Sequence, residues 1–313
     1  MTTSHCNLTD VSIVVLSYNR RDAIARNLAT LLDLVEQTGC ELVVVDNASA
    51  DGSADVIRNL LNGRDHTVFI PSPINLGVAG GRNLGWREAT RGHILSIDDD
   101  TIVSAEAVEA LMAAMHRDSQ LGIASPRIIH AKTGASQLSF SDGERQLSNF
   151  HGACHLIRRP VLDAIGYNDE GCAFGGEELD LSIRARAAGF AVEYVGQALV
   201  LHDNFARPGD EGRDRRERWI YNFTRVFNKH FPLAVAVPFS LRNLLSHIVV
   251  GGRSFGPWHS LALIGAAARG FRDGRRTHKS VPAAVVQFYR DPTLRPEYGN
   301  VPVWRKLMQR LAS

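Results

Sequence analysis

Val11-Ser-Ile-Val-Val-Leu-Ser-Tyr-Asn-Arg20 is the stretch that decides the fold we expect for this chain. Its first six residues are apolar and mostly β-branched, a polar turn follows, and a helical pattern continues to about residue 37. Similar apolar runs at 41–45, 67–70 and 93–97 alternate with helical patterns at 53–62 and 75–90. Apolar strands separated by helices indicate a parallel sheet covered on both faces. We therefore predict an α/β fold with a mostly parallel, Rossmann-like sheet flanked by helices.

Composition limits the class of protein further. The 313 residues are 44% hydrophobic and 22% charged, which is typical of a folded globular chain and excludes a disordered or fibrous one. No charge-free apolar run is long enough to span a membrane, and the first ten residues lack the features of a secretory signal. Four cysteines without CxxC spacing indicate reduced thiols rather than disulfides or a zinc site. We expect a cytoplasmic protein.

The net charge of +2 conceals an asymmetry along the chain. Residues 1–203 contain 26 acidic and 16 basic residues, whereas residues 204–313 contain 7 acidic and 19 basic ones. The acidic part is suited to metal ions and the basic part to an anionic partner, such as phosphate, a membrane surface or nucleic acid. A solvated basic helical surface explains the second part equally well. We find no helix-turn-helix and no aromatic RNA-binding motif, so nucleic acid is not expected.

Polar residues cluster where three of the predicted strands end, and ligands of such sheets bind beyond those ends. The clusters are residues 17–20, Asp46-Asn47 and Asp98-Asp99-Asp100. Three adjacent carboxylates repel one another unless cations or hydrogen-bond donors neutralise them. Oxygen ligands of this kind suit Mg²⁺ or Mn²⁺. The alternative is that these residues only cap the next helix, with Thr101 or Ser104 at its start.

A glycine-rich stretch opens the helix at residues 75–90. Gly77, Gly80 and Gly81 lie at the loop-to-helix junction, where backbone amides can meet phosphate and Arg82 adds charge. The stretch is neither a Walker A loop nor a dinucleotide fingerprint. Tight packing of helix on sheet explains the glycines equally well.

Acidic residues also begin the helix predicted at 177–188. Glu177, Glu178 and Asp180 fall in its first turn, where the helix dipole favours them. Because Gly175-Gly176 precede them, the junction can also present a carboxylate to a cleft as a general base. Asp180 and Arg184 have the spacing of an ion pair within a helix. His202, which follows an apolar run, is expected to be structural unless it lies near Asp100.

The order of these motifs resembles the family 2 glycosyltransferases. The motifs are VSIVVLSYNR, VVVDNASADGS, NLGVAGGRNLG, LSIDDD, GACHLIRR, FGGEELDLSIRARAAG and LVLH, spread over residues 11–232. The resemblance implies a GT-A fold and inversion at the anomeric centre, and bacterial rhamnosyltransferases are the members it suggests. It also implies a glycosyltransferase domain at 1–231, with a nucleotide-binding part at about 11–130 and an acceptor and catalytic part at about 131–231. A basic helical C-terminal extension would occupy 232–313.

The resemblance assigns roles to individual positions. Asp98 would face the ribose, Asp100 and His202 would hold the metal, and Gly152-Ala153 would border the sugar. Glu178 would be the general base, although Glu177 beside it leaves that assignment open, and Asp180 would be a further catalytic acid. Glu177 would also contact the donor sugar or the acceptor. The remaining residues of the nucleotide pocket would be Ser17, Tyr18, Asn19, Arg20, Asp46, Asn47, Gly77, Arg82 and Asp99.

The resemblance also implies partners. The donor would be a nucleotide-diphosphate sugar, with UDP or dTDP favoured because Asp46 is compatible with a pyrimidine, and the cofactor a divalent metal. The acceptor hydroxyl could belong to a glycan, a lipid-linked saccharide or a small natural product. A homo-oligomeric assembly is also compatible with the resemblance. Aromatic residues in the basic tail favour peripheral contact with the inner face of a membrane or a docking surface for a partner subunit, although aromatic residues at helical spacing are more often core. They are Phe223, Phe227, Phe231, Phe255, Trp258, Phe271 and Trp304.

Two other functions compete with this hypothesis. A nucleotidyltransferase that makes sugar nucleotides has a similar sheet, but it usually carries a glycine-rich basic signature after the first strand, which is missing here. A catalytically inactive scaffold at a membrane surface is the second, and the acids kept at all three positions argue against it.

Overall fold

The computed structural model of the chain describes residues 8–136, 145–172, 174–203, 212–255, 257–291 and 294. Helices and strands alternate through the first half, as the sequence predicts. The strands are β1 (Val11–Ser17), β2 (Glu41–Asp46), β3 (Thr67–Pro71), β4 (His93–Asp98), β5 (Thr101–Ile102), β6 (Leu121–His130), β7 (Arg145–Gln146), β8 (Cys154–Arg158) and β9 (Ala191–His202). The helices are α1 (Arg21–Thr38), α2 (Ser53–Leu61), α3 (Gly77–Glu88), α4 (Ala105–Arg117), α5 (Arg159–Ile165), α6 (Glu177–Ala187), α7 (Gly212–His230), α8 (Leu233–Phe255), α9 (Pro257–Arg276) and α10 (Ala283–Arg290).

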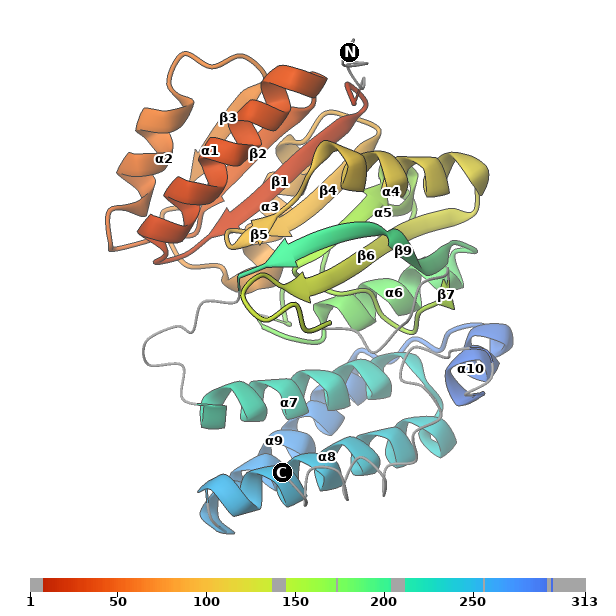
Figure 1. Ribbon diagram of the computed structural model, residues 1–313. Helices are drawn as coiled ribbons and strands as arrows, with labels where there is room; N and C mark the ends of the chain where they lie inside the picture. The colour runs from red at the N-terminus through yellow and green to blue at the C-terminus, as the bar shows by residue number, and fades with distance from the viewer. Residues whose placement is uncertain are drawn as a thin grey trace.

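One curled sheet runs through the molecule (Figure 1). Its strand order is β3-β2-β1-β4-β8-β6-β9-β5, with β7 paired to β9. β1, β2, β3 and β4 are parallel, as expected from their apolar sequences, whereas β8 is antiparallel to both of its neighbours. The antiparallel strand pairings of the described residues all involve β8 or β9, which come from the second half of the chain.

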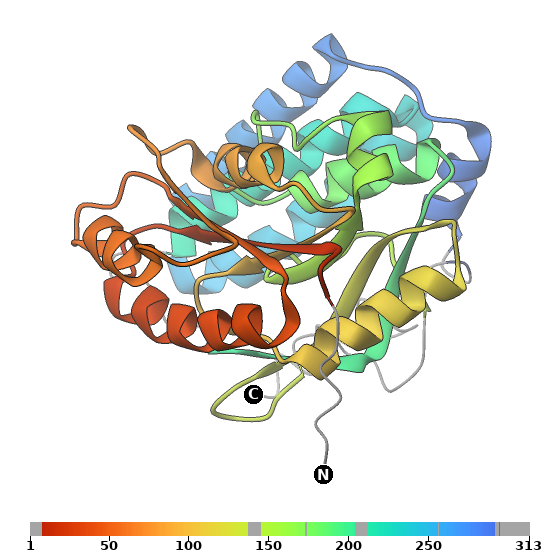
Figure 2. The ribbon, with the colours of Figure 1, turned by 90° about the horizontal axis from the view of Figure 1, so that it is seen from above.

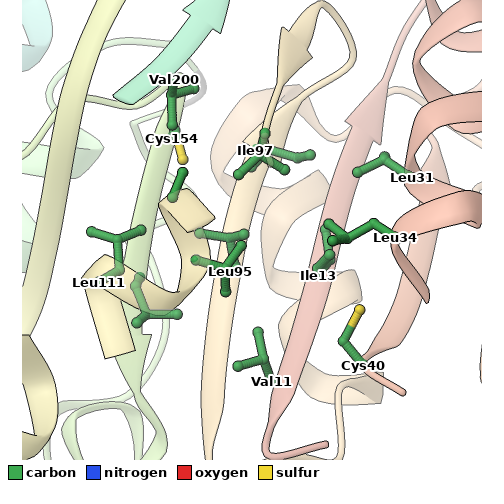
Figure 3. Close-up of a cluster of buried hydrophobic side chains, with 14 of the residues drawn as sticks. Val11, Ile13, Leu31, Leu34, Cys40, Leu95, Ile97, Leu111, Cys154 and Val200 are labelled. Atoms are coloured by element: carbon green, nitrogen blue, oxygen red, sulfur yellow. The ribbon is translucent and has the colours of Figure 1, made fainter. Parts of the chain in front are cut away.

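Helices cover both faces of the sheet. Figure 2 shows α1 and α4 on one face and α3 and α5 on the other. Side chains of α1 and α4 pack on alternate residues of the strands, such as Ile13 and Leu95, which Figure 3 shows with Leu31 and Leu111. The intervening residues, such as Val14 and Ile94, face Trp86 of α3 and the helices beside it. Because the strands are apolar on both sides, each face forms its own core.

α7, α8 and α9 lie below the sheet in Figure 1. α7 packs on α6 through a cluster that includes Leu179, Ile183 and Val226. Phe223, Phe227 and Phe231 pack in the same cluster, so three of the aromatic residues that favoured membrane contact belong to the core. Over the described residues, no helix combines the length and the apolarity needed to cross a membrane.

Several expectations fall partly outside the described residues. Residues 132–150 are polar and rich in glycine and serine, which predicts a loop that could act as a lid, and the structure describes them only up to 136 and from 145, where β7 begins. Cys40, Cys154 and Cys172 are buried free thiols, as predicted, and Cys6 lies outside the described range. Ser104 caps α4 by accepting a hydrogen bond from the Ala107 amide. The division of the chain at residue 231 stays a prediction.

Candidate functional site

The carboxyl ends of β1, β2 and β4 lie side by side at one edge of the sheet. In the strand register Ser17 lies opposite Asp46, and Leu16 lies opposite Asp98. Ser17 Oγ donates a hydrogen bond of 3.0 Å to Asp99 Oδ2, which joins the end of β1 to the residues after β4. The sequence expectation that polar clusters converge at this edge is therefore confirmed.

A strand-end cluster forms around these carboxylates, and we define it as Arg20, Asp98, Asp99, Asp100 and His202. Arg20 Nη1 forms an ion pair with Asp100 Oδ2 and lies 3.5 Å from Asp99 Oδ1. The end of β9 pairs with β5, which brings His202 Nε2 to 3.0 Å from Asp100 Oδ1. His202 thus meets the condition under which the sequence favoured a functional role over a structural one.

The environment separates the acidity of two neighbouring carboxyls in this cluster. Burial raises the pKa of Asp99 to about 7, and the Asp100 and Asp98 charges add to this rise against the effect of Arg20. Burial also acts on Asp100, but hydrogen bonding from His202 and the Arg20 charge lower its pKa to about 2. Asp100 is therefore held ionised, and the Asp100 carboxylate in turn raises the pKa of His202.

The donor set fits a divalent metal. Asp98, Asp100 and His202 each offer one ligand atom, and these atoms all lie within 4.8 Å of one another. Two carboxylate oxygens and one imidazole nitrogen suit Mg²⁺ or Mn²⁺.

Two glutamates form the second acidic part of the site, and we call Glu177 and Glu178 the glutamate pair. They begin α6 directly after Gly175 and Gly176, whose φ angles of +78° and +94° suit glycine. A side chain at 176 would also crowd Asn222 of α7, with its Cβ 3.0 Å from that of Asn222. The two glycines therefore allow the chain to turn tightly into α6 where it packs on α7.

Arg82 joins the glutamate pair to the strand-end cluster. Its Nη2 atom donates a hydrogen bond of 2.8 Å to Asp98 Oδ1, and its Nη1 atom lies 3.9 Å from Glu177 and 3.8 Å from Glu178. The guanidinium is almost completely buried. One arginine of α3 thus brings both acidic groups to one centre, which no sequence spacing could reveal.

Gly152 and Ala153 lie between the two acidic groups. The Gly152 carbonyl accepts a hydrogen bond of 2.8 Å from Arg82, and the Ala153 carbonyl accepts one from the Asp98 amide. A Cβ atom at residue 152 would collide with Glu178 Oε1. The absence of a side chain at 152 therefore gives the Glu178 carboxylate its position.

The two glutamates differ in access. The Glu177 side chain is 3% exposed and the Glu178 side chain 20%. Glu177 Oε2 is buried and has no hydrogen-bond partner among the described residues. Burial raises the pKa of Glu177 to about 8, with a further rise from the Glu178 charge, and burial also raises the pKa of Glu178 against the effect of Arg82. This corner of the site is thus disposed to accept a proton.

The predicted nucleotide-binding residues have different partners. Asn47 binds the glycine-rich turn, since its side chain contacts Asn75, the Gly77 carbonyl and the Leu76 amide. Asn19 adopts a left-handed φ of 51° and accepts a hydrogen bond from the Ala50 amide. Both residues shape the loops at this edge, beside the half-buried Tyr18.

Asp46 has one buried oxygen without a hydrogen-bond partner among the described residues of the same region. Its Oδ2 atom accepts a hydrogen bond of 3.0 Å from the Ser49 amide. Its Oδ1 atom is buried and has no hydrogen-bond partner among the described residues. The end of β2 therefore presents a single unsatisfied acceptor.

Asp180 is not brought to the site. It is completely buried, and its carboxylate contacts Arg184 at 2.7 Å, Lys229 at 2.8 Å and His230 at 2.7 Å. The pairing with Arg184 that the spacing predicted is confirmed. These three contacts, two of them from α7, fasten α6 to the helix below it.

His151 is a site residue that the sequence analysis missed. Burial lowers its pKa to about 4 against the effect of Asp98, and its Nδ1 atom accepts a hydrogen bond from the Ala153 amide. A neutral imidazole therefore lies beside the acidic centre. The only signal in the sequence was its position directly before Gly152.

Two family models match the chain. "Glycosyl transferase family 2" matches residues 12–166, and "Glycosyl transferase family group 2" matches residues 93–269, which is more than half of the chain. The low-salt glycan biosynthesis hexosyltransferase Agl10 of Haloferax volcanii is 27% identical over 68% of this chain and 73% of its own length. The poly-β-1,6-N-acetyl-D-glucosamine synthase of Staphylococcus epidermidis is 23% identical over 62% of this chain, which spans only half of that enzyme.

Solved structures support the same fold at lower identity. The Pyrobaculum calidifontis mannosyltransferase PcManGT, solved with GDP-Man and Mn²⁺, is 17% identical with a TM-score of 0.58 over 97% of this chain and 85% of its own. S. aureus TarS (1-349) is 15% identical with a TM-score of 0.60 over 90% of this chain and 91% of its own. The fold is therefore GT-A, as the sequence predicted. With more than half of its length matched by the family group and its motifs assembled at one sheet edge, the chain belongs to the family 2 glycosyltransferases.

Proposed function

We propose that this glycosyltransferase moves a sugar from a UDP or dTDP donor to an acceptor hydroxyl, with inversion at the anomeric carbon and Glu178 as the general base. The observation that carries the proposal is the Arg82 bridge, which holds Asp98 and Glu178 at opposite sides of one guanidinium. A charged leaving group and a hydroxyl nucleophile need this combination of a cation-binding site and a nearby base.

Exposure favours Glu178 over Glu177 as the base. A general base must reach the proton that it removes, and the Glu178 side chain is 20% exposed against 3% for Glu177. The raised pKa of Glu178 suits a group that takes a proton during the reaction. As the acceptor oxygen bonds to C1, its proton passes to Glu178 and the bond from C1 to the diphosphate oxygen breaks.

The strand-end cluster would face the diphosphate. A divalent metal at Asp98, Asp100 and His202 would supply the positive charge that stabilises the departing phosphate oxygens. Two of the structural neighbours were solved with Mn²⁺, which supports a divalent metal without distinguishing Mn²⁺ from Mg²⁺. In this chain Arg20 and His202 keep Asp100 ionised, so that it stays competent to bind a cation.

Asp46 supports a pyrimidine donor. Its single unsatisfied oxygen matches the one N–H that uracil or thymine presents on its ring, whereas guanine presents two neighbouring donors. One TarS structure was solved with UDP, and PcManGT with GDP-Man, so the fold alone accepts either base.

Thermal shifts with nucleotides test the proposal. UDP, dTDP and GDP would each be added with Mn²⁺, with Mg²⁺ and with a chelator, because a ligand that binds only the folded state raises the unfolding midpoint. We expect a rise with UDP or dTDP only in the presence of metal, and its loss in Asp100→Ala. His202→Ala should weaken the metal dependence, while the exposed Glu109→Ala should behave as the wild type.

Two results would contradict the proposal. Stabilisation by GDP alone would overturn the donor base, and an unchanged metal response in Asp100→Ala would remove that residue from the metal site. Turnover with a sugar donor separates an active enzyme from the inactive scaffold considered above.

A further inference from the structure

Large apolar side chains are exposed where α8 turns into α9. Three lie on one face of α8 at four-residue spacing, and three lie in the first turns of α9. Each is more than two-fifths exposed, and Trp258 is 81% exposed. We call this set the hairpin patch: Leu241, Leu245, Val249, Trp258, Leu261 and Ile264.

The hairpin patch is not needed for the packing of these helices. The opposite side of each helix meets α7, where Leu244 and Ile248 of α8 join Ile220 of α7 and Leu263 of α9 in a separate core. His247 of α8 lies against Trp219, and His259 of α9 lies 3.7 Å from Glu217. Trp219 and Glu217 are in the N-terminal half of α7. The inner faces are therefore occupied, and the outer faces are left to the solvent. Apolar side chains gathered in this way mark an interaction surface.

Charge on α8 and on α9 up to Arg272 is of one sign, and the next residue is Asp273, whose Oδ1 atom lies 3.1 Å from Arg272 Nε. Residues 233–272 contain four arginines and no acidic residue. Arg242 lies beside Leu241 on α8, Arg269 and Arg272 follow Ile264 on α9, and all three are exposed. Glu217, Arg213 and Arg216 of α7 all act electrostatically on His259, so two further arginines and one acid lie near the start of α9.

The positive charge of these arginines indicates which kind of partner the hairpin patch binds. A second copy of the chain would bring the same arginines together, and their repulsion would oppose the apolar contact. An anionic bilayer instead matches both features, since its phosphates pair with arginine while its acyl boundary accepts tryptophan, leucine and isoleucine. None of the helices of the described chain can cross a membrane, so such contact would be parallel to the bilayer surface.

We propose that the hairpin patch, with its arginines, docks the enzyme onto an anionic phospholipid surface. This inference stands apart from the proposed reaction, because it rests on α8 and α9 and on none of the site residues. It keeps Trp258 from the aromatic set that the sequence suggested and adds the five aliphatic residues of the patch, while Phe223, Phe227 and Phe231 belong to the core.

Flotation of the full chain with vesicles tests the proposal. One vesicle set would contain phosphatidylcholine alone and the other phosphatidylcholine with phosphatidylglycerol. We expect the wild type to float with the second set only, and added salt to release it. The double variant Leu245→Glu with Ile264→Glu should lower binding at least about tenfold, since it puts charges into the acyl boundary. Leu199→Glu, at an exposed apolar residue of β9, is the matched control and should bind as the wild type.

The proposal fails if the wild type ignores phosphatidylglycerol vesicles, or if the double variant binds them as well as the wild type does. Equal binding to both vesicle sets would overturn the role of the arginines. Light scattering of the proteins without vesicles adds a further check. If the wild type is a dimer and the double variant is a monomer, the patch is instead an interface between two copies of the chain. If the double variant does not fold, Trp258→Ala, at the most exposed of the six residues, answers the same question.

Discussion

The two acidic groups of the site are neutralised in different ways. In the strand-end cluster, Asp100 has Arg20 and His202 as direct partners, and its pKa falls to about 2. In the glutamate pair, Arg82 is the shared cation at nearly 4 Å, one oxygen of Glu177 has no partner among the described residues, and the pKa of Glu177 rises to about 8.

This difference separates two chemical tasks. A carboxylate held ionised at every working pH is suited to bind a cation, because protons do not compete for it. A buried carboxyl with a raised pKa is suited to exchange a proton. Arg82 contacts both groups, so its charge is divided between them and neutralises neither completely.

The largest effect should come from Glu178→Gln. The amide keeps the shape of the carboxylate but cannot take the acceptor proton, so we expect turnover to fall roughly 10²- to 10⁴-fold. Donor binding, followed by the thermal shift with nucleotide and metal, should change little, because the strand-end cluster is untouched. Glu88→Gln, an exposed acid of α3, is the control for the substitution itself.

Glu177→Gln distinguishes the two glutamates. We expect it to retain much more turnover than Glu178→Gln, because its side chain is 3% exposed and cannot reach an acceptor. If Glu177→Gln is inactive and Glu178→Gln is not, the base is one residue earlier and the argument from exposure is wrong.

The sequence could predict the parts of this comparison but not their connection. The strands were readable because β1, β2 and β4 are apolar on both faces, and the acids at their ends follow from that pattern. Glu177 and Glu178 could be placed at a helix start because Gly175-Gly176 precede them. The Arg82 bridge depends on how α3 and α6 pack on the same side of the sheet, which no local pattern records.

Contacts across long sequence distances explain the other differences. Asp180 is separated from Lys229 and His230 by about fifty residues, so its burial against α7 could not be read from the first turn of α6. The C-terminal half of β9 was visible only as an apolar run, and its pairing with β5 is what puts His202 beside Asp100. The aromatic residues of α7 likewise showed helical spacing without showing which face is covered.

The next largest effect is a loss of stability in Asp180→Ala, which compares Asp180 with the glutamate pair on the same helix, α6. Asp180 lies one turn from the glutamate pair and is fully compensated, with its pKa held well below the ordinary range by His230, Arg184 and Lys229 despite burial. Asp180→Ala removes the carboxylate that His230 and Arg184 share, although Lys229 keeps Asp169 as a partner at 2.6 Å, so we expect a loss of about 3–5 kcal/mol in the free energy of unfolding. Denaturant unfolding measures it, with the exposed Asp163→Ala as control. A loss no larger than that of the control would show that α7 does not need this contact.

The smallest effect is a pH dependence that belongs to Glu177. An acid with a higher pKa in the folded state binds its proton more tightly there, so its contribution favours folding at low pH. That contribution is lost as the pH rises from about 4.5 to about 8. Glu177→Gln removes the titration, and we expect the variant to gain stability relative to the wild type across this window. The Glu178 charge contributes to the raised pKa of Glu177. When Glu177→Gln is made in the Glu178→Gln background, we therefore expect the pH range over which it changes stability to be narrower. Unfolding midpoints of the four proteins across pH give the comparison, and a difference independent of pH would mean that Glu177 is neutralised as completely as Asp100.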